Sequence, residues 1–246
     1  HRSPGGLFAR MAKILLTRSL QAQMRKSALE VGADSTWRRP YAVFALHYEP
    51  ERTSIPDGLP IDYAGDAIAK VRELLPVDVT LVVKEHYSQQ ASALRGFLGR
   101  SPLFYGVIKR FPNTIFSPTK GSLISLVAGA EAVFTLTGTI AIEAVLKGIP
   151  VGYFGSPWWD GLPGSIRLGD DTDFSDLLAA DIPTSNAVLD FLRTRHLLEM
   201  LPGIGSESQK KVIERFGELP PNFNEAEAQS IVNLLLGSCG PGPRTL

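Results

Sequence analysis

The chain has 246 residues, 44% of them hydrophobic, and its 25 Lys plus Arg balance 25 Asp plus Glu. This composition excludes a disordered or collagen-like chain and provides enough apolar residues for a substantial core. The single cysteine, Cys239, excludes an internal disulfide and a thiolate metal cage, so nothing in the sequence requires an oxidising compartment.

We therefore expect a cytoplasmic protein. No apolar run reaches the ~18 residues that span a bilayer, and no charged-then-apolar signal peptide opens the chain. The first residue is His1 rather than Met, which we interpret as a processed product or a piece of a longer protein.

Residues 1–40 form a predicted N-terminal segment that is strongly basic. They carry eight basic and two acidic side chains, so the rest of the chain has an excess of acidic ones. Apolar residues at helical spacing predict a basic amphipathic helix: Leu7, Phe8, Met11, Ile14, Leu15 and Met24. We expect this helix to pack on a neighbouring domain or to contact an anionic membrane surface. Nucleic acid is not an expected partner, because the remaining chain is acidic.

From residue 41 the sequence alternates between predicted strands and helices. The strands are expected at 41–48, 77–83, 114–117, 132–136 and 150–154, and the helices between them at 61–75, 94–111, 121–129 and 139–147. The C-terminal third is predicted to be mainly helical, most clearly at 186–200 and 225–236. This alternation predicts an α/β fold, a Rossmann-like doubly wound parallel sheet, within one domain spanning 41–246.

Polar residues follow the predicted strands at their carboxyl ends, where ligands bind to sheets of this kind. These residues are His47, Glu49 and Glu51 after the first strand, Lys84 and His86 after the second, Ser117 after the third, and Thr137, Gly138 and Thr139 after the fourth. We expect them to converge on one crevice.

The turn at 135–144 predicts an anion site. It joins a strand directly to a helix N-terminus, where the helix dipole and unpaired N–H groups attract phosphate. The hydroxyls of Thr137 and Thr139 can donate to phosphate oxygens, and Gly138 allows a close approach of the backbone. The same residues could instead only cap the helix.

These motifs together resemble the capsule polysaccharide biosynthesis family, which includes Kdo transferases. The resemblance rests on residues 46–51, 83–86 and 137–139, together with Glu143, Gly148, Pro150, Gly155 and the pair Trp158 and Trp159. It implies a GT-B glycosyltransferase, of which this chain would be the C-terminal, donor-binding half. It also implies CMP-Kdo as the donor, a glycolipid or polysaccharide as the acceptor, and a place at the inner face of the bacterial inner membrane.

The resemblance also implies roles for individual residues. Lys84 and His86 would face the phosphate or the donor carboxylate, with Ser117 beside them at the strand ends. Residues 137–139 would hold phosphate, Glu143 would approach the ribose, and His47 and Glu51 would line the crevice. An N-terminal acceptor domain of similar size would be missing from the chain.

The catalytic base is expected to be a carboxylate or a histidine, because a sugar hydroxyl is a poor nucleophile without one. Glu51 and His47 are the candidates, although Pro50 fits equally well a turn in which Glu49 and Glu51 are structural.

Two further motifs have competing interpretations. The acidic run 170–173 could hold a divalent metal, but a solvated loop with Asp173 as a helix N-cap is the favoured interpretation, and no metal or other cofactor is expected. Trp158 and Trp159 could stack on a base or sugar, or pack in the protein. Two functions remain as alternatives to transfer: a non-catalytic nucleotide- or glycan-binding module, and a UDP-sugar epimerase on the same scaffold.

Overall fold

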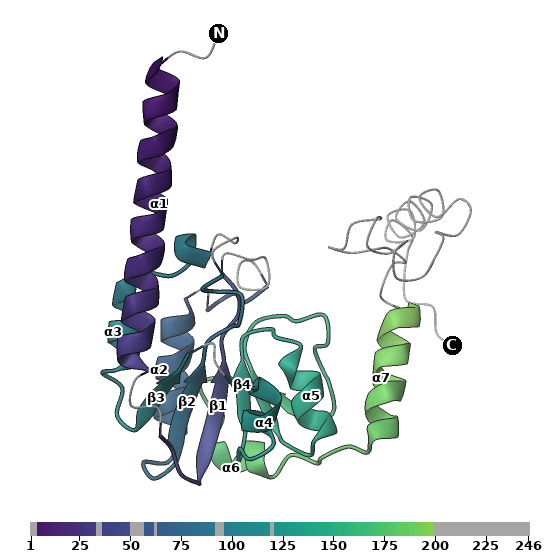
Figure 1. Cartoon of the computed structure of the whole chain (residues 1–246). Coiled ribbons are helices and arrows are strands. Elements are labelled where there is room, and N and C mark those ends of the chain that lie inside the picture. Colours follow the sequence, from purple (N-terminus) through teal and green to yellow (C-terminus); the bar gives the residue numbers. More distant parts are fainter. Residues whose placement is uncertain are drawn as a thin grey trace, which may run out of the picture. The chain divides into compact units, whose positions relative to one another are not determined.

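A computed structural model describes residues 4–32, 36–49, 57–61, 63–91, 96–118 and 121–198 (Figure 1). The chain divides into two compact units, residues 1–189 and 190–246. The first unit contains the sheet, and of the second unit the structure describes residues 190–198. The helix predicted at 186–200 is present as α7 (Ser185–Leu198), whereas the one predicted at 225–236 lies outside the described residues.

The first unit is built on one six-stranded parallel sheet. Its strands are β1 (Tyr41–Ala45), β2 (Thr80–Lys84), β3 (Thr114–Ser117), β4 (Val133–Thr135), β5 (Val151–Tyr153) and β6 (Ser165–Arg167). They lie in the order β3-β2-β1-β4-β5-β6, and every neighbouring pair is parallel. This is the Rossmann strand order, so the predicted doubly wound parallel sheet is confirmed.

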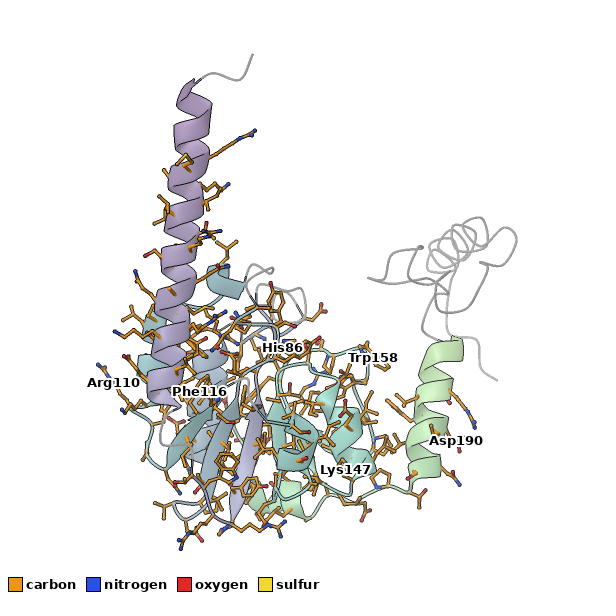
Figure 2. The ribbon with its side chains drawn as sticks, in the orientation of Figure 1. His86, Arg110, Phe116, Lys147, Trp158 and Asp190 are labelled. Atoms are coloured by element: carbon orange, nitrogen blue, oxygen red, sulfur yellow. The ribbon has the colours of Figure 1, made fainter. Side chains whose placement is uncertain are left out.

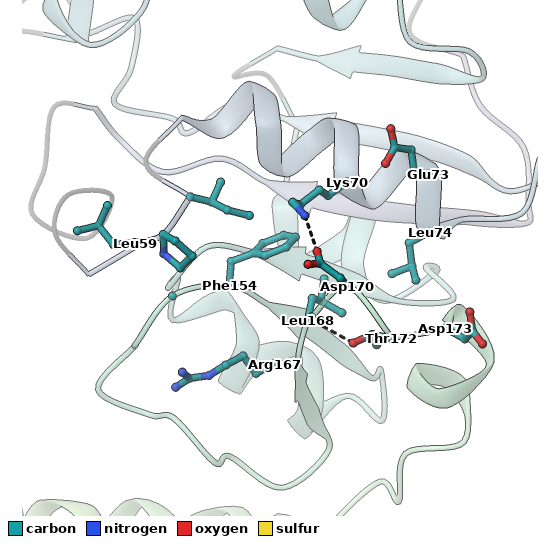
Figure 3. A pocket seen from close by; sticks show the side chains of 14 residues that line it. Leu59, Lys70, Glu73, Leu74, Phe154, Arg167, Leu168, Asp170, Thr172 and Asp173 are labelled. Atoms are coloured by element: carbon teal, nitrogen blue, oxygen red, sulfur yellow. Dashed lines mark hydrogen bonds and ion pairs between the residues drawn. The ribbon is translucent and has the colours of Figure 1, made fainter.

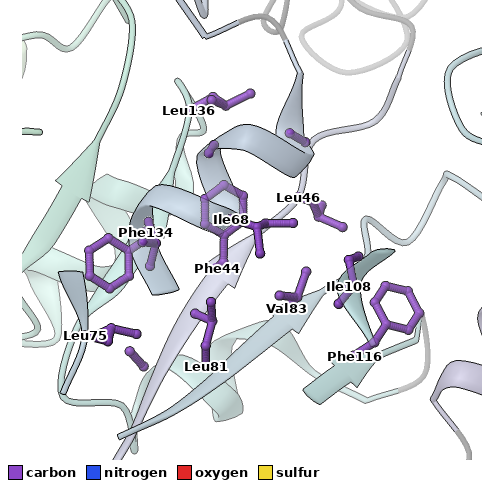
Figure 4. Packing of buried hydrophobic residues seen from close by; sticks show 14 of the residues in the cluster. Phe44, Leu46, Ile68, Leu75, Leu81, Val83, Ile108, Phe116, Phe134 and Leu136 are labelled. Carbon is purple, nitrogen blue, oxygen red and sulfur yellow. The ribbon is translucent and has the colours of Figure 1, made fainter. Parts of the chain in front are cut away.

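Helices cover both faces of the sheet. The core on one face joins apolar residues of β1, β2 and β4 to α2 (Ala64–Leu74) and α3 (Pro102–Ile108), and Phe44, Ile68, Leu81 and Phe134 meet there (Figure 4). The other face of the sheet is equally buried, since β1 is buried at all five of its residues. The helices α4 (Leu123–Val127) and α5 (Ile140–Leu146) connect β3 to β4 and β4 to β5. The helix α6 (Phe174–Leu178) adds Phe174 and Leu177 to the core on the first face. Burial on both faces explains the continuous apolar runs of the strands.

A buried arginine holds the amino ends of the strands. Arg72 on α2 is 7% exposed, and its guanidinium donates to the carbonyl oxygens of Leu75 at 2.8 Å and Val79 at 2.7 Å. It also donates to the carbonyl of Asn113 at 3.3 Å, directly before β3. Arg72 therefore fixes the segments that enter β2 and β3, at the edge of the sheet opposite the predicted crevice.

The helix predicted at 94–111 is shorter in the structure. It is replaced by a short 3-10 helix, η1 (Gly96–Leu98), a turn, and then α3, which begins with Pro102 at its first position. A side chain at Gly99 would lie 2.4 Å from the backbone carbonyl carbon of Glu49, so the turn packs directly on the segment after β1. The strand β6 was not predicted, because this edge strand of three residues has no buried apolar run.

The N-terminal helix α1 (Pro4–Val31) differs from the amphipathic prediction. Its C-terminal half lies against the sheet unit through Met24 and Ala28, which are 3% and 0% exposed. Its other half extends away from the sheet (Figure 1), and the consecutive residues Ile14, Leu15 and Leu16 are all more than half exposed. Consecutive helical residues point about 100° apart, so these side chains do not share one face. Of the helices that the structure describes, none is long and apolar enough to cross a membrane.

Candidate functional site

A cavity of about 570 Å³ lies at the carboxyl ends of β1, β2 and β4. This is the point where the strand order reverses, between β1 and β4, and where ligands bind to sheets of this topology. The cavity brings together seven of the predicted site residues: His47, Lys84, His86, Thr137, Gly138, Thr139 and Glu143. Figure 2 shows His86 and Trp158, which also line this cavity, at the same edge of the sheet.

Two predicted residues are not among those that line the cavity. Ser117 ends β3, is 5% exposed, and pairs with Lys84 in the sheet register. Its carbonyl accepts from the Glu85 N–H at 3.0 Å, which holds β3 against the end of β2. Glu51, the first candidate for the base, lies outside the described residues, and its role stays a prediction.

His47 is buried and tied to the turn after β4. Its Nε2 accepts the N–H of Thr137 at 3.2 Å and lies 3.1 Å from the hydroxyl oxygen of Thr135. With Nε2 as an acceptor, the proton of the neutral ring is on Nδ1. Burial lowers the pKa of His47 to about 4, and the positive charge of Arg100 acts in the same direction. The ring is therefore neutral at physiological pH, and His47 lines the cavity.

His86 has the opposite tautomer. Its Nδ1 accepts the N–H of Ser88 at 3.3 Å, so the proton of the neutral ring is on Nε2. Burial lowers the pKa of His86, and Arg100 lowers it further. The ring lies 4.6 Å from that of Tyr87 and 6.1 Å from that of Tyr48, centroid to centroid. His86 thus lines the cavity as a second neutral imidazole, beside the rings of Tyr48 and Tyr87.

Lys84 is the ammonium group of the cavity. It is 4% exposed, donates to the carbonyl oxygen of Pro118, and burial lowers its pKa. Because a buried ammonium favours an anionic partner, Lys84 is a strong candidate for binding phosphate or carboxylate.

The turn after β4 is more constrained than its sequence suggested. The N–H of Thr137 already donates to His47, and the N–H of Gly138 donates to the Thr135 hydroxyl at 3.1 Å. The first amides of the turn therefore hold the protein together, and the groups of the turn considered for an anion are the hydroxyl and the amide of Thr139. Gly138 is required because a Cβ atom there would lie 2.7 Å from the Thr135 hydroxyl oxygen.

The two adjacent tryptophans have different environments in the structure. Trp159 is fully buried, donates through Nε1 to the carbonyl of Thr137 at 3.2 Å, and packs edge-on against Tyr153 at 4.8 Å. Trp158 is 47% exposed and lines the cavity. Packing is therefore the role of Trp159, whereas Trp158 is placed to stack on a ligand ring.

A buried charged network supports the cavity from the protein side. Arg100 lies 2.5 Å from Glu49 and 3.7 Å from Glu85 in two ion pairs, and it donates to the carbonyl of His47 at 3.0 Å. Glu85 also accepts the hydroxyl of Tyr105 at 2.8 Å, while burial raises its pKa. Sequence reasoning missed Arg100 because it lies in a turn, far along the chain from each partner. The only available signal was the position of Glu49 and Glu85 at strand ends.

The carboxylates near the cavity differ in their ion pairing and exposure. Glu49 and Glu85 are held by Arg100, whereas Glu143, in the first turn of α5, is exposed on the cavity wall. Glu143 is thus the one that a ligand hydroxyl could reach among the three.

The chain matches no protein-family model and no curated protein. Among solved structures, it is similar to KpsC of Thermosulfurimonas dismutans, described as a beta Kdo 2,7 transferase. The identity is 18%, the TM-score is 0.42, and the match covers 73% of this chain and 55% of that one. A second structure, the beta Kdo 2,4 transferase KpsC of the same organism, matches with 12% identity and a TM-score of 0.42 over 70% and 54% of the two chains. The chain therefore spans about half the length of both.

A second cavity of about 580 Å³ lies between α2 and the segments after β5 and β6 (Figure 3). Its two cations are already paired, Lys70 with Asp170 at 2.9 Å and Arg167 with Asp160. All four side chains are more than a third exposed, so the pairs provide weak, screened attraction for a charged ligand. The cavity at the ends of β1, β2 and β4 has the stronger binding chemistry.

The acidic run 170–173 has a structural role. Asp170 pairs with Lys70, and the N–H of Asp173 donates to the carboxylate of Asp176 at 3.0 Å at the start of α6. Asp173 is the N-cap of α6, as the favoured interpretation predicted. Within the described part of the chain, no three His, Cys, Asp or Glu side chains are grouped as metal ligands.

Proposed function

We propose that the chain binds a nucleotide-activated sugar in the cavity at the ends of β1, β2 and β4, as the donor-binding half of a glycosyltransferase. The donor suggested by the motif resemblance is CMP-Kdo. The acceptor would be a bacterial glycolipid or polysaccharide, bound largely by a further domain at the inner face of the inner membrane. No metal is required in this proposal, because the cavity itself supplies a cation and several hydrogen-bond donors.

The observation that carries the proposal is the convergence of anion-binding groups at the switch point of the sheet. The buried Lys84, the histidines His47 and His86, and Thr139 line one cavity. These groups fit a phosphate or carboxylate, and the exposed ring of Trp158 on the same wall fits the flat face of a base or sugar. A nucleotide-linked acidic sugar has both kinds of group.

The geometry favours a binding role for His47 over a basic one. A general base needs a free lone pair, and that of His47 Nε2 is directed at Thr137 and Thr135. We assign His47 to donating a hydrogen bond to the ligand and retain Glu51 as the proposed base. Glu143 is proposed to bind a ribose hydroxyl.

Calorimetric titration of the purified chain with CMP, UMP, UDP and ADP tests the proposal. We expect saturable binding with a preference for CMP, weakened at least tenfold in Lys84→Met and His86→Ala, because each loses a donor to the anion. Lys70→Met is the matched control, since Lys70 is a paired, half-exposed cation outside the cavity. Failure of all four nucleotides to bind the folded chain at millimolar concentration would refute the proposal.

A non-catalytic binding module is the second candidate. It is favoured by one observation, that Glu49 and Glu85 are both engaged by Arg100 while His47 has no free lone pair on Nε2. Assay of the full-length protein with CMP-Kdo and a glycolipid acceptor distinguishes the two, since a module binds the nucleotide without turnover. The epimerase alternative requires a preference for UDP over CMP in the same titration.

A further inference from the structure

The cavity histidines come from two different strand ends, and the ladder reaches only the residues before them, where the Leu46 N–H donates to the Lys84 carbonyl oxygen at 3.0 Å. His47 follows β1 and His86 follows β2, each beyond the last paired residue of its strand. The contacts that join these two segments therefore determine whether both rings face one ligand.

Two side chains make those contacts. Gln89 accepts the N–H of Glu49 at 2.8 Å and donates to the Glu49 carbonyl oxygen at 3.0 Å, whereas Arg100 contacts the His47 backbone and the carboxylate next to His86. The Arg100 side chain is 1% exposed and lies over the ring of Phe104, with the guanidinium carbon 4.4 Å from the ring centroid. On the β1 side the guanidinium donates to the His47 carbonyl and pairs with Glu49. On the β2 side it pairs with Glu85, whose carboxylate in turn accepts the N–H of His86 at 3.1 Å.

We propose that Arg100 is the positioning residue of the cavity: its guanidinium joins the segments after β1 and β2 and holds His47 and His86 as uncharged hydrogen-bond donors. The proposal rests on the proposed function of the site as an anion-binding nucleotide site. A planar fork with five donors can contact a carbonyl and two carboxylates at once, which an ammonium group cannot do in the same geometry.

The charge of Arg100 acts together with its geometry. Each ring is a titratable neighbour of the other. The further titratable and charged groups around the two rings are Tyr48 and Glu49 after β1, Lys84, Glu85 and Tyr87 at the end of β2, Arg100 before α3, and Glu143 across the cavity. Burial is the main cause that lowers the pKa of both rings, Arg100 lowers both further, and His86 adds to the effect at His47. A neutral imidazole keeps one acceptor nitrogen for the protein and one N–H for the ligand.

Three variants test the proposal, with NMR titration of the histidine Cε1–H signals in the nucleotide-free chain. The chain has four histidines, so His47→Gln and His86→Gln identify the two signals. Arg100→Met/Glu49→Gln removes the guanidinium and one of its anions together, and Glu49→Gln alone isolates the effect of the carboxylate. Arg100→Lys keeps the positive charge but loses the fork. Combining Arg100→Met with Glu49→Gln avoids leaving both Glu49 and Glu85 as unpaired carboxylates in the interior.

We expect the titration midpoints of both histidines to rise in Arg100→Met/Glu49→Gln relative to Glu49→Gln, because a buried cation that lowers both pKa values is lost. In Arg100→Lys the midpoints stay near those of the wild type, while the affinity for CMP falls about tenfold because the forked contacts to the His47 carbonyl, Glu49 and Glu85 are lost. The control is Arg72→Lys, which removes an equally buried fork at the opposite edge of the sheet. It should lower the melting temperature without moving either midpoint.

Midpoints unchanged by the loss of the guanidinium, or moved as far by Arg72→Lys, would overturn the proposal. A wild-type midpoint of His47 at or above that of an exposed histidine would also overturn it. If the wild-type chain binds neither CMP nor UMP, the proposed function fails, but the nucleotide-free titrations still decide the role of Arg100.

Discussion

At the scale of single residues, Gly138 shows how closely the cavity floor is packed. A Cβ atom there would lie 2.7 Å from the Thr135 hydroxyl oxygen and 3.3 Å from Cε1 of His47. We expect Gly138→Ala to lose ~1–3 kcal/mol of stability and to weaken CMP binding about tenfold, because the alanine displaces His47. Thermal denaturation and calorimetry measure the two effects. The matched control is Gly106→Ala on α3, where the added Cβ meets no atom within 4 Å and helix propensity improves.

His47 also predicts a pH dependence of stability. Its pKa is about 4 in the folded chain against 6.5 for the ordinary side chain, so between these values the unfolded chain binds more protons. The contribution of His47 to stability is therefore complete above pH 6.5 and is lost as the pH falls towards 4. It amounts to about 3 kcal/mol by linkage. Urea denaturation at pH 7 and pH 4.5 should show a smaller loss for His47→Gln than for the wild type. An equal loss in both would contradict the assignment.

What could be predicted at this scale was the position of residues along strands, not their partners. Lys84, His86 and Thr137 each follow an apolar run, so their place at one edge of a parallel sheet was readable from local pattern. The hydrogen bond between His47 and Thr137 joins residues 90 positions apart. No local sequence pattern reveals that pairing. The sequence therefore predicted free N–H groups in the turn, whereas those of Thr137 and Gly138 donate to His47 and Thr135.

At the scale of elements, Trp159 links the connection after β5 to the turn after β4. Trp159→Phe keeps an aromatic ring against Tyr153 but removes the donor to the Thr137 carbonyl. We expect a loss of ~1–2 kcal/mol of stability, because a buried carbonyl loses its partner, together with weaker CMP binding. Trp158→Phe should leave the melting temperature unchanged while lowering CMP affinity. Equal effects on stability in the two variants would show that the tryptophans are not divided in this way.

The alternation of strands and helices was predictable, because both faces of the sheet are covered and its strands are therefore apolar throughout. The predicted helix at 94–111 was wrong over the turn at 99–101, since apolar spacing continues across a break caused by tertiary packing. Gly99 lies against the backbone of Glu49, and that contact depends on the folded sheet.

At the scale of the whole molecule, α1 is attached by a small number of buried contacts. Ala28 is fully buried, whereas Leu16 is 63% exposed on the half that extends away from the sheet. We expect Ala28→Glu to destabilise the first unit by about 3 kcal/mol, because it buries an unpaired carboxylate, and Leu16→Gln to leave its stability unchanged. Chemical denaturation followed by circular dichroism measures both. A similar loss in the two variants would mean that the outer half of α1 is also covered.

The hydrogen bonds around Thr137 have a consequence for the kinetics of ligand capture. Its N–H is held by His47 and its carbonyl by Trp159, so both peptide groups flanking this residue are oriented without any ligand. Fixing the backbone of one residue costs about 1–2 kcal/mol in conformational entropy, and at Thr137 this entropy is lost on folding rather than on ligand binding. Binding then needs no ordering step in the turn, so association is expected to follow a single exponential whose rate rises linearly with ligand concentration.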